Sequence, residues 1–277
     1  MHVRTRGRRR GQLGDGATVR ETIPKEVRGP LVGRRIKMIS AGDCHSMALT
    51  QDGCVFAWGS GSCGQIGHGG YEDVLEPVQI GGALTGRRVR EISAGGEHSL
   101  ALIDDGRACA WGSQEYGQLG AGVFGGWQLE PTEVAIPTHS STSEPTSTVL
   151  RFRTLSAGGL HSLAASEDGK VFAWGNANHG QLGQGHREAL PVPTAVAGAL
   201  VDQRVTAVAA GGDHSVVLTD CGQVLSWGSG ECGQLGHGVE EDLLLPRMLE
   251  RLHATQVAAG ALHTGVLTAE GKVEACV

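Results

Sequence analysis

The sequence predicts an all-β fold, a β-propeller built from about five repeat units. The first observation is a 29-residue frame, Ala210 to Gly238, that recurs without a gap at Ala41 to Gly69, Ala94 to Gly122 and Ala157 to Gly185. The second is its spacing of 53, 63 and 53 residues, because self-similarity near 50 residues is typical of propellers and solenoids. The third is that the 45 glycines fall at fixed offsets among Val, Leu, Ile and Trp, which indicates turns rather than low complexity.

Each unit contains short segments with β propensity. In the first complete unit, residues 17–40 are a connector that ends in a predicted strand with Ile36, Met38 and Ile39. His45 to Thr50 and Cys54 to Trp58 follow, joined at Asp52-Gly53, and Asp-Gly between such runs is a strong hairpin signal. Each unit therefore supplies three or four antiparallel strands and no helix, as one propeller blade does.

The two ends of the chain are partial units. Gly11 to Gly16 matches Gly64 to Gly69, so the chain begins within a repeat, and the last unit runs only from Ala259 to Val277. We therefore expect four complete units and one blade split between the termini, an arrangement that could close a ring of five. Closure would be weak, because Cys276 stands where the other units have Trp, and loss of a buried Trp costs about 3 to 5 kcal/mol. We favour the other interpretation, an incomplete seven-bladed ring that is part of a longer protein.

Charge divides the chain into a basic tip, residues 1–10, and the propeller repeats, residues 11–277. The net charge is -6, yet five Arg lie in the first ten residues, which leaves 18 basic against 29 acidic residues in the rest. An acidic body argues against a general DNA-binding face and suits a basic protein partner. Nucleic acid or chromatin would bind only through the tip, which is either a nuclear-import or nucleic-acid arm or an accidental start.

Compartment is indicated by the cysteines and the N-terminus. The seven Cys form no CxxC pair and no zinc-ligand spacing with His, and an odd number of scattered thiols fits a reducing compartment. The first ten residues lack the apolar core of a secretory signal, and no apolar run reaches membrane-spanning length. We expect a cytoplasmic or nuclear protein that does not act at a membrane.

Several motifs suggest chemistry that the repeat pattern argues against. Gly59 to Gly64 and Gly228 to Gly233 fit G-x-G-x-x-G, but no helix follows to meet a pyrophosphate, so we expect no cofactor. One His per unit invites comparison with a metal site, but histidines on separate blades lie too far apart to share an ion. These are His45, His98, His161, His214 and His263. We expect each imidazole to hydrogen-bond the backbone of its own tight turn, and we predict no catalytic or metal-binding residue.

The Trp-Gly tryptophans are predicted to be core residues. They are Trp58, Trp111, Trp174 and Trp227. A buried Trp removes roughly 150 to 250 Å² from water, which few other side chains in these Gly-rich repeats could do. We therefore interpret them as structural and not as a platform for a ligand.

The combination of Ala-Gly-x-x-His-Ser, Trp-Gly and Gly-Gln-Leu-Gly resembles the regulator-of-chromosome-condensation repeat family. The resemblance covers nearly the whole chain from Gly11 and implies a propeller, usually of seven blades. The family includes an exchange factor for the small GTPase Ran, ubiquitin ligases and a plant ultraviolet photoreceptor. The photoreceptor pattern calls for Trp two residues before each His, where this chain has Asp43, Gly96, Gly159, Gly212 and Ala261, so light sensing is not expected.

Three hypotheses for function follow. The first is a non-enzymatic scaffold or adaptor that binds a protein partner through its irregular loops. The second is guanine-nucleotide exchange on a small GTPase, and the third is a chromatin adaptor that uses the Arg-rich tip. Candidate contact residues lie in the unequal connectors: Glu72 and Asp73, Trp127 in the longest insertion, and Glu240, Glu241 and Asp242.

Overall fold

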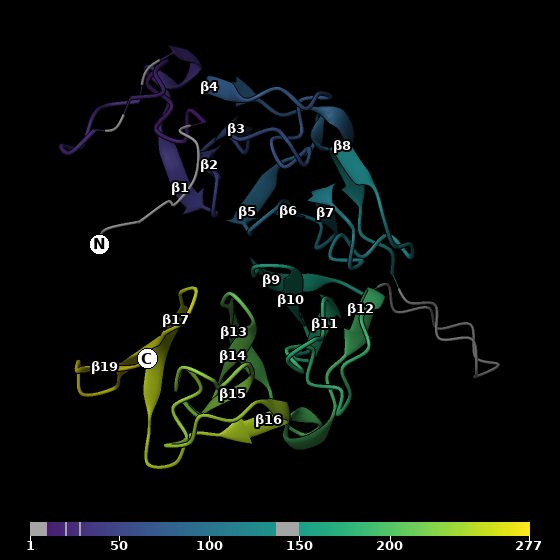
Figure 1. The fold of residues 1–277 in the computed structure, drawn as a ribbon, viewed down its shortest axis with the longest axis vertical. Coiled ribbons are helices and arrows are strands. Elements are labelled where there is room, and N and C mark those ends of the chain that lie inside the picture. Colours follow the sequence, from purple (N-terminus) through teal and green to yellow (C-terminus); the bar gives the residue numbers. More distant parts are fainter. Residues whose placement is uncertain (1–9, 20, 28, 137–149) are drawn as a thin grey trace.

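The computed structural model describes residues 10–19, 21–27, 29–136 and 150–277. These residues form five β-sheets arranged around an axis as propeller blades (Figure 1), which confirms the predicted fold class. Four sheets have four antiparallel strands in chain order, and the last has three. Within the described ranges the helices are three short 3-10 turns, at Gly29–Leu31, Gly82–Leu84 and Gly198–Leu200, and none has the length that a membrane crossing requires.

The strands keep the repeat register. Blade 1 is β1 (Ile36–Ala41), β2 (His45–Thr50), β3 (Val55–Gly59) and β4 (Val74–Gln79). Blade 2 is β5 (Val89–Ala94), β6 (His98–Ile103), β7 (Ala108–Ser113) and β8 (Trp127–Glu133). Blade 3 is β9 (Phe152–Ala157), β10 (His161–Ser166), β11 (Val171–Gly175) and β12 (Leu190–Ala195). Blade 4 is β13 (Val205–Ala210), β14 (His214–Thr219), β15 (Val224–Gly228) and β16 (Leu243–Met248), and blade 5 is β17 (Ala254–Ala259), β18 (Thr264–Thr268) and β19 (Val273–Cys276).

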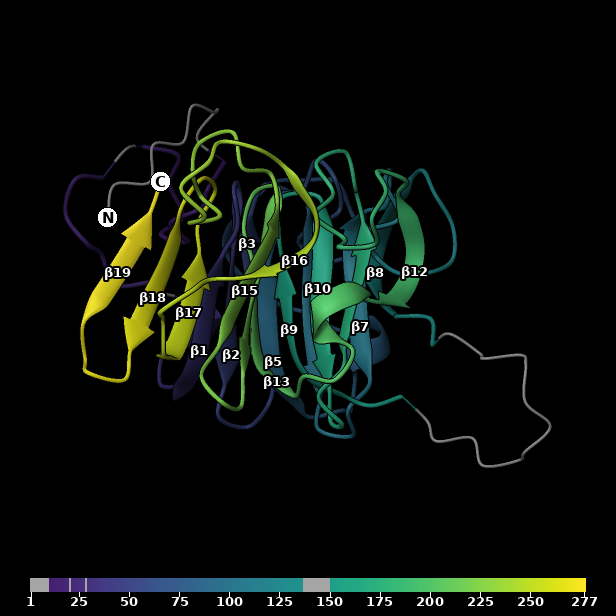
Figure 2. The ribbon, with the colours of Figure 1, turned by 90° about the horizontal axis from the view of Figure 1, so that it is seen from below.

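Up-and-down connectivity sorts the connections onto two faces. The turn from first to second strand and the loop from third to fourth strand lie at one end of each blade, which we call the upper face (Figure 2). The hairpin from second to third strand and the connection to the next blade lie at the other end, the lower face. Blades 1 to 4 therefore contribute the same kinds of connection to the same face, and blade 5 contributes its first turn and its hairpin in the same way.

The hydrophobic core lies between neighbouring sheets. Met47 and Leu49 of blade 1 pack in one cluster with Ile92 and Trp111 of blade 2, and similar clusters join the later blades. A β-sheet of this size cannot bury its own faces, so each blade depends on its neighbour. The two end blades have one neighbour each, and exposed apolar residues such as Ile39 and Val273, both about 75% exposed, lie there.

The expected split blade takes a different form. Residues 21–26 correspond to β4 by the repeat spacing but form no strand, so within the described residues the sheet of β17, β18 and β19 gains no strand from the N-terminus. Gly11 to Gly16 instead lies against blade 1, where Trp58 Nε1 donates to Gln12 O at 2.9 Å. Val27 and Leu31 pack on Phe56 beside it. The N-terminal segment thus covers part of the free side of blade 1, and the arc of blades stays open in Figure 1 between β1 and β17.

Candidate partner-binding surface

The repeated His and Ser residues connect successive blades. His45 Nε2 lies 2.8 Å from Ser99 Oγ of the next blade, and Ser99 Oγ donates to Gln65 O at 2.8 Å. The Trp111 indole N–H donates to the same carbonyl at 2.9 Å. Equivalent contacts recur at the later junctions, for His98 with Ser162, His161 with Ser215 and His214 with Thr264. This differs from our expectation that each imidazole bonds its own turn, because that turn is already closed by backbone hydrogen bonds such as Gly42 N to His45 O.

These histidines are held neutral. Ser99 donates its hydroxyl hydrogen to the Gln65 carbonyl. His45 Nε2 must therefore carry a hydrogen, which it donates to Ser99 Oγ. Burial lowers the pKa of His45 to about 4 and that of His98 to about 3. It also lowers the pKa of His161 to about 3, with smaller contributions from neighbouring imidazoles, and that of His214 to about 4. A neutral, sequestered imidazole that hydrogen-bonds a structural hydroxyl holds two blades together and does not accept a substrate proton.

All six predicted contact residues lie at the upper face, because five belong to loops between third and fourth strands and Trp127 begins the fourth strand of blade 2. Asp73 and Asp242 are equivalent in the repeat and make the same contact: each accepts a backbone N–H, from Gly61 at 3.1 Å and from Gly230 at 3.2 Å. Arg187 Nη1 lies 2.9 Å from Asp242. Burial raises the pKa of Asp242, but the hydrogen bonds from Arg187 and Gly230 outweigh it and lower the pKa overall. These two aspartates therefore shape their loops.

The three glutamates are available to a partner. Glu72 has 81% of its side chain exposed, and its carboxylate faces His68 Nε2 at 3.6 Å. Glu240 and Glu241 are exposed at the tip of the loop before β16.

Trp127 lies outside the insertion in which we had placed it. It follows Gly112 by the same interval as Val74 follows Gly59, so the loop before β8 has the ordinary length. The extra residues lie between β8 and β9, in a connection of the lower face, and residues 137–149 of it are outside the described ranges. Trp127 itself begins β8 at the upper face, 53% exposed, and forms a T-shaped pair with Tyr71 at 6.0 Å between ring centroids.

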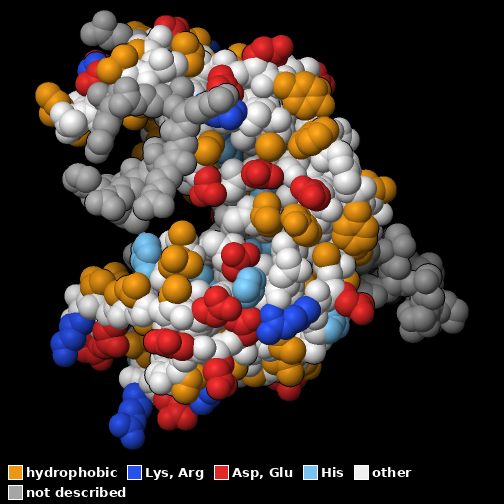
Figure 3. Space-filling model, in the orientation of Figure 1, with side chains coloured by type: hydrophobic (Ala, Val, Ile, Leu, Met, Phe, Trp, Pro, Cys, Tyr) orange, Lys and Arg blue, Asp and Glu red, His pale blue; other side chains and the backbone are white. Residues whose placement is uncertain are grey.

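The upper face concentrates negative charge. In its described turns and loops, residues 10–16 included, the acids are Asp15, Asp43, Glu72, Asp73, Glu97, Glu115, Glu188, Asp213, Glu231, Glu240, Glu241 and Asp242. Arg10 and Arg187 are the Lys and Arg residues of the same described segments. Figure 3 shows this face, with carboxylates across its middle. We call these acids the acidic face.

Five of these twelve acids were predicted as contact residues and seven were not, among them Asp43, Glu97 and Asp213. Asp43, Glu97 and Asp213 each lie one or two residues before a repeated His, in the turn nearest the axis. They differ in position by one residue, so they do not align as a repeat element. Burial raises the pKa of Asp43, as expected for a carboxylate in a crowded turn.

The lower face has balanced charge and its own repeated contact. Its described connections hold ten Lys or Arg residues (Arg34, Arg35, Arg87, Arg88, Arg107, Arg151, Lys170, Arg204, Arg251 and Lys272) against nine acids (Asp52, Asp104, Asp105, Glu167, Asp168, Asp202, Asp220, Glu250 and Glu270). Arg88, Arg151 and Arg204 precede the first strand of their blades, and each lies across the hairpin of the preceding blade and donates to its carbonyls. Sequence spacing could have revealed this position, because Arg35, Arg88, Arg151 and Arg204 share one repeat offset.

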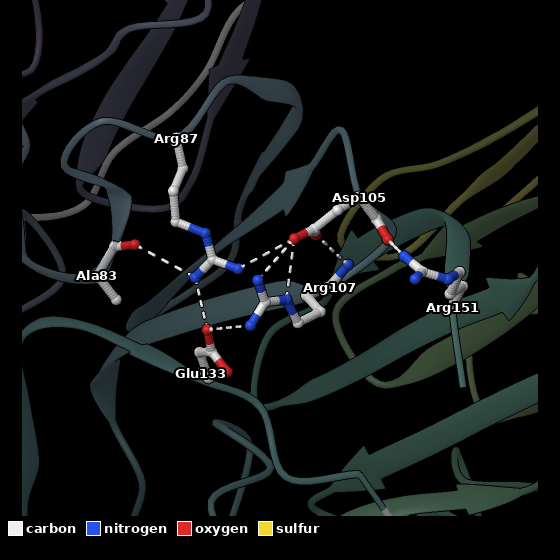
Figure 4. Close-up of polar contacts among 6 residues, drawn as sticks. All are labelled: Ala83, Arg87, Asp105, Arg107, Glu133 and Arg151. Carbon is white, nitrogen blue, oxygen red and sulfur yellow. Dashed lines mark hydrogen bonds and ion pairs between the residues drawn. The ribbon is translucent and has the colours of Figure 1, made fainter. Parts of the chain in front are cut away.

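An ion-pair network reinforces the lower face at blade 2 (Figure 4). Arg107 Nη2 lies 2.7 Å from Asp105 Oδ2, and both Arg107 and Arg87 contact Glu133. The hydrogen bond from Arg107 lowers the pKa of Asp105 to about 2. The network joins a hairpin, an inter-blade connection and β8, and its charges satisfy one another.

Two groups of side chains at the upper face contain residue types that can bind a metal or act as a nucleophile. Ligand atoms of His179, Glu231 and Asp242 lie within 4.8 Å of one another, the one such group of three among the described residues, but the Arg187 guanidinium already binds the Asp242 carboxylate. A hollow of about 210 Å³ near the axis is lined by Cys44, Cys63 and neighbouring polar residues. Burial raises the pKa of both thiols, which opposes the thiolate that a nucleophile needs. Neither group forms an acid, base and nucleophile arrangement.

Blades that share one hydrogen-bonded junction, built from His, Ser, Gln and Trp at fixed offsets, define a repeat propeller whose variable parts are its loops. Residues 3–276 match the RCC1-like domain, and the chain belongs to that family. This confirms the resemblance found in the sequence.

This chain spans only part of the length of the proteins to which it is similar. It is 33% identical over 267 residues to the ultraviolet-B receptor UVR8 of Arabidopsis thaliana, covering 95% of this chain and 58% of the receptor. It is 34% identical over 244 residues to the human E3 ubiquitin-protein ligase HERC2, covering 86% of this chain and 5% of the ligase. Among solved structures, human WBSCR16 superposes with a TM-score of 0.77 and 27% identity, covering 91% of this chain and 65% of that one. Prp20p of Saccharomyces cerevisiae, in a structure described with its binding properties to Gsp1p and histones, gives 0.70 and 26%, covering 88% and 56%.

Proposed function

We propose that this protein is a non-catalytic scaffold whose acidic face binds a basic protein partner. The observation that carries the proposal is the separation of charge: carboxylates dominate the upper face, while the lower face is balanced. A surface of one sign raises the rate of encounter with a partner of the other sign and disfavours partners of the same sign. The similarity to Prp20p supports it, since histones are basic proteins.

The rigid blade junctions support a binding role for the loops. Each junction repeats the same buried hydrogen bonds, so the strands hold the loops at fixed positions. Loops on a rigid scaffold can vary without disturbing the core, and binding residues are frequently found there. The exposed carboxylates of Glu72, Glu240 and Glu241 would make the partner contacts.

A charge-reversal pair with a matched control tests the proposal. The double variant Glu240→Lys and Glu241→Lys changes the acidic face, and Asp202→Lys with Glu250→Lys makes the same charge change on exposed residues of the lower face. We expect purified core histones, as a basic probe, to bind wild type and the lower-face variant alike and the upper-face variant at least about fivefold more weakly, with a steep loss in salt. Equal binding by both variants contradicts the proposal.

The second candidate is guanine-nucleotide exchange on a small GTPase. The family resemblance and the similarity to Prp20p favour it. Stopped-flow release of a fluorescent GDP analogue from a panel of small GTPases tests it, and the absence of acceleration across the panel removes it.

Two further hypotheses concern location and the Arg-rich N-terminal tip. We propose a cytoplasmic or nuclear protein from the odd number of scattered thiols, which imaging of a tagged chain checks. Binding of chromatin through the Arg-rich tip stays a prediction, since residues 1–9 lie outside the described ranges, and deletion of residues 1–10 should abolish it. Light sensing is not proposed, because Asp43 and Gly96 stand where the photoreceptor pattern has Trp.

A further inference from the structure

An exposed aromatic rim borders the acidic face at blades 1 and 2. Tyr71, Phe124 and Trp127 are 50%, 54% and 53% exposed, and Val123 beside them is 52% exposed. Figure 3 shows hydrophobic side chains gathered on this edge of the upper face, around β8. The chain has few aromatic residues in total, four Phe, two Tyr and five Trp, so three at one edge form a distinct surface.

The repeat register shows that this rim is specific to these blades. Tyr71 and Phe124 occupy one repeat position, at which blade 3 has Arg187 and blade 4 has Glu240. Trp127 occupies the first position of the fourth strand, at which the others have Val74, Leu190 and Leu243. The Tyr71 ring from blade 1 meets Trp127 of blade 2 at an interplanar angle of 90°. The junction of blades 1 and 2 therefore carries a fixed aromatic pair that the other described junctions lack.

The surroundings of the pair are anionic. Glu72 follows Tyr71 directly, and the Glu130 carboxylate lies beside Gly69. The two stretches that form the rim, residues 60–73 and 114–130, contain no Lys or Arg. The Trp127 indole N–H has no protein acceptor among the described residues, whereas the four core indoles each donate to a backbone carbonyl. The rings are thus exposed and flanked by carboxylates, and no Lys or Arg among the described residues lies over them.

We propose that this aromatic rim is the subsite that receives an Arg or Lys side chain of the basic partner, with an adjoining apolar side chain of that partner against Phe124 and Val123. A cation over the face of an indole or phenol ring is attracted by the ring quadrupole, most strongly for Trp. A T-shaped pair leaves ring faces open for that contact. The same interaction occurs in the described part of this chain, where the Arg34 guanidinium lies 5.0 Å from the centre of the Phe56 ring.

This inference rests on the proposed binding of a basic partner. It names the residues that would select which side chain of that partner is bound. Scattered carboxylates attract any cationic surface, whereas the rim requires a basic residue beside an apolar one at a fixed place.

Trp127 itself provides a direct measurement. The four other tryptophans are at most 6% exposed, so acrylamide quenching of the intrinsic fluorescence reports mainly on Trp127. The probes are a capped heptapeptide that alternates Leu and Arg, the same peptide with Lys, and the same peptide with Gln or Glu in place of Arg. We expect the Arg and Lys peptides to protect Trp127 from acrylamide at submillimolar concentration and the Gln and Glu peptides to leave quenching unchanged.

Calorimetric titration of variants with the Arg peptide completes the test. We expect Trp127→Ala to bind about fivefold more weakly, the ratio that corresponds to about 1 kcal/mol for an exposed cation–π contact. Glu72→Gln should weaken binding by a smaller factor, and Val239→Ala, an exposed apolar position on the same face in blade 4, should not change it. Trp127→Ala truncates an exposed side chain, so far-UV circular dichroism should show the same fold.

The outcomes separate this inference from the proposed function. If Trp127→Ala binds the Arg peptide and histones as wild type does, while the Glu240 and Glu241 reversal weakens histone binding, the acidic face is supported and the aromatic subsite is refuted. If the Gln peptide protects Trp127 as well as the Arg peptide, the rim is an apolar site and the choice of a cation is refuted. If no cationic peptide protects Trp127 at millimolar concentration, the subsite is refuted as well.

Discussion

The four buried junction histidines should make this propeller lose stability in mild acid. Burial holds the pKa of His45 and His214 at about 4 and that of His98 and His161 at about 3, whereas an unfolded histidine titrates near 6.5. Below pH 6.5 the unfolded chain binds protons that the folded chain excludes, so the free energy of unfolding falls as the pH falls. The contribution is fully present above about pH 7 and is lost progressively from pH 6.5 to about pH 4 for His45 and His214 and to about pH 3 for His98 and His161.

The size of the effect follows from the number of histidines. At pH 5 each histidine lowers the free energy of unfolding by about 2 kcal/mol relative to pH 7, because pH 5 lies about 1.5 units below the unfolded pKa and one unit corresponds to about 1.4 kcal/mol. Four such histidines give roughly 8 kcal/mol, an upper figure, comparable to the whole stability of many domains. Burial raises the pKa of Asp43 and Glu91, which offsets part of this loss because those carboxyls bind protons more readily in the folded state.

Urea unfolding at several pH values between 7.5 and 5 measures the slope of the free energy of unfolding against pH. Near pH 5, the unfolding of wild type should take up close to four protons. The slope of the free energy of unfolding against urea concentration should be the same at each pH. His98→Asn should reduce the slope by about one proton, whatever it does to stability at pH 7.5, because the side chain that it removes is one of the four. A flat stability between pH 7 and pH 5, or the same slope in His98→Asn, would refute the assignment of neutral buried imidazoles.

Three further predictions concern single side chains. Trp111→Ala should lower the free energy of unfolding by about 3 to 5 kcal/mol in chemical denaturation, because the indole is fully buried, whereas the half-exposed Trp127→Ala should cost less than about 0.5 kcal/mol. Gly106→Ala should cost more than Gly86→Ala, since both have positive φ but only at Gly106 would a Cβ meet another residue, Arg151 at 2.8 Å; equal melting temperatures would contradict this. Asp105→Asn should cost less than about 1 kcal/mol, because the ion pair is partly exposed, and the difference from wild type should shrink in 1 M salt.

Much of the fold was predictable because the aligned copies of the repeat show which positions are equivalent in each blade. The offsets of the Asp-Gly pairs and the Trp-Gly pairs predicted strands at His45–Thr50 and Cys54–Trp58, and the structure has them at His45–Thr50 and Val55–Gly59. Period alone gave the fold class, since a unit of this length with short strands and many turns cannot bury its faces without neighbours.

Contacts between blades were less predictable. The sequence showed that His45 and Ser46 recur together, but it could not show that His45 bonds Ser99 of the next blade, because that distance depends on how two sheets face each other. Trp127 was assigned to the insertion since both lie in one long connector, and only the strand pairing of β8 separates them. The prediction of a fourth strand for the last blade was wrong for a related reason. Repeat spacing shows which position of a blade a terminal segment corresponds to, but it does not show which sheet that segment joins.

The sequence by itself determined the architecture of repeated blades and the residues that recur in each of them, because these depend on local turn chemistry and on periodic burial, and both are repeated in every unit. Only the tertiary structure decided how charge and aromatic residues are distributed, because the up-and-down order of strands brings loops 50 or more residues apart to the same end of the molecule. Scattered acids thereby became one face, and Tyr71 met Trp127 across two blades.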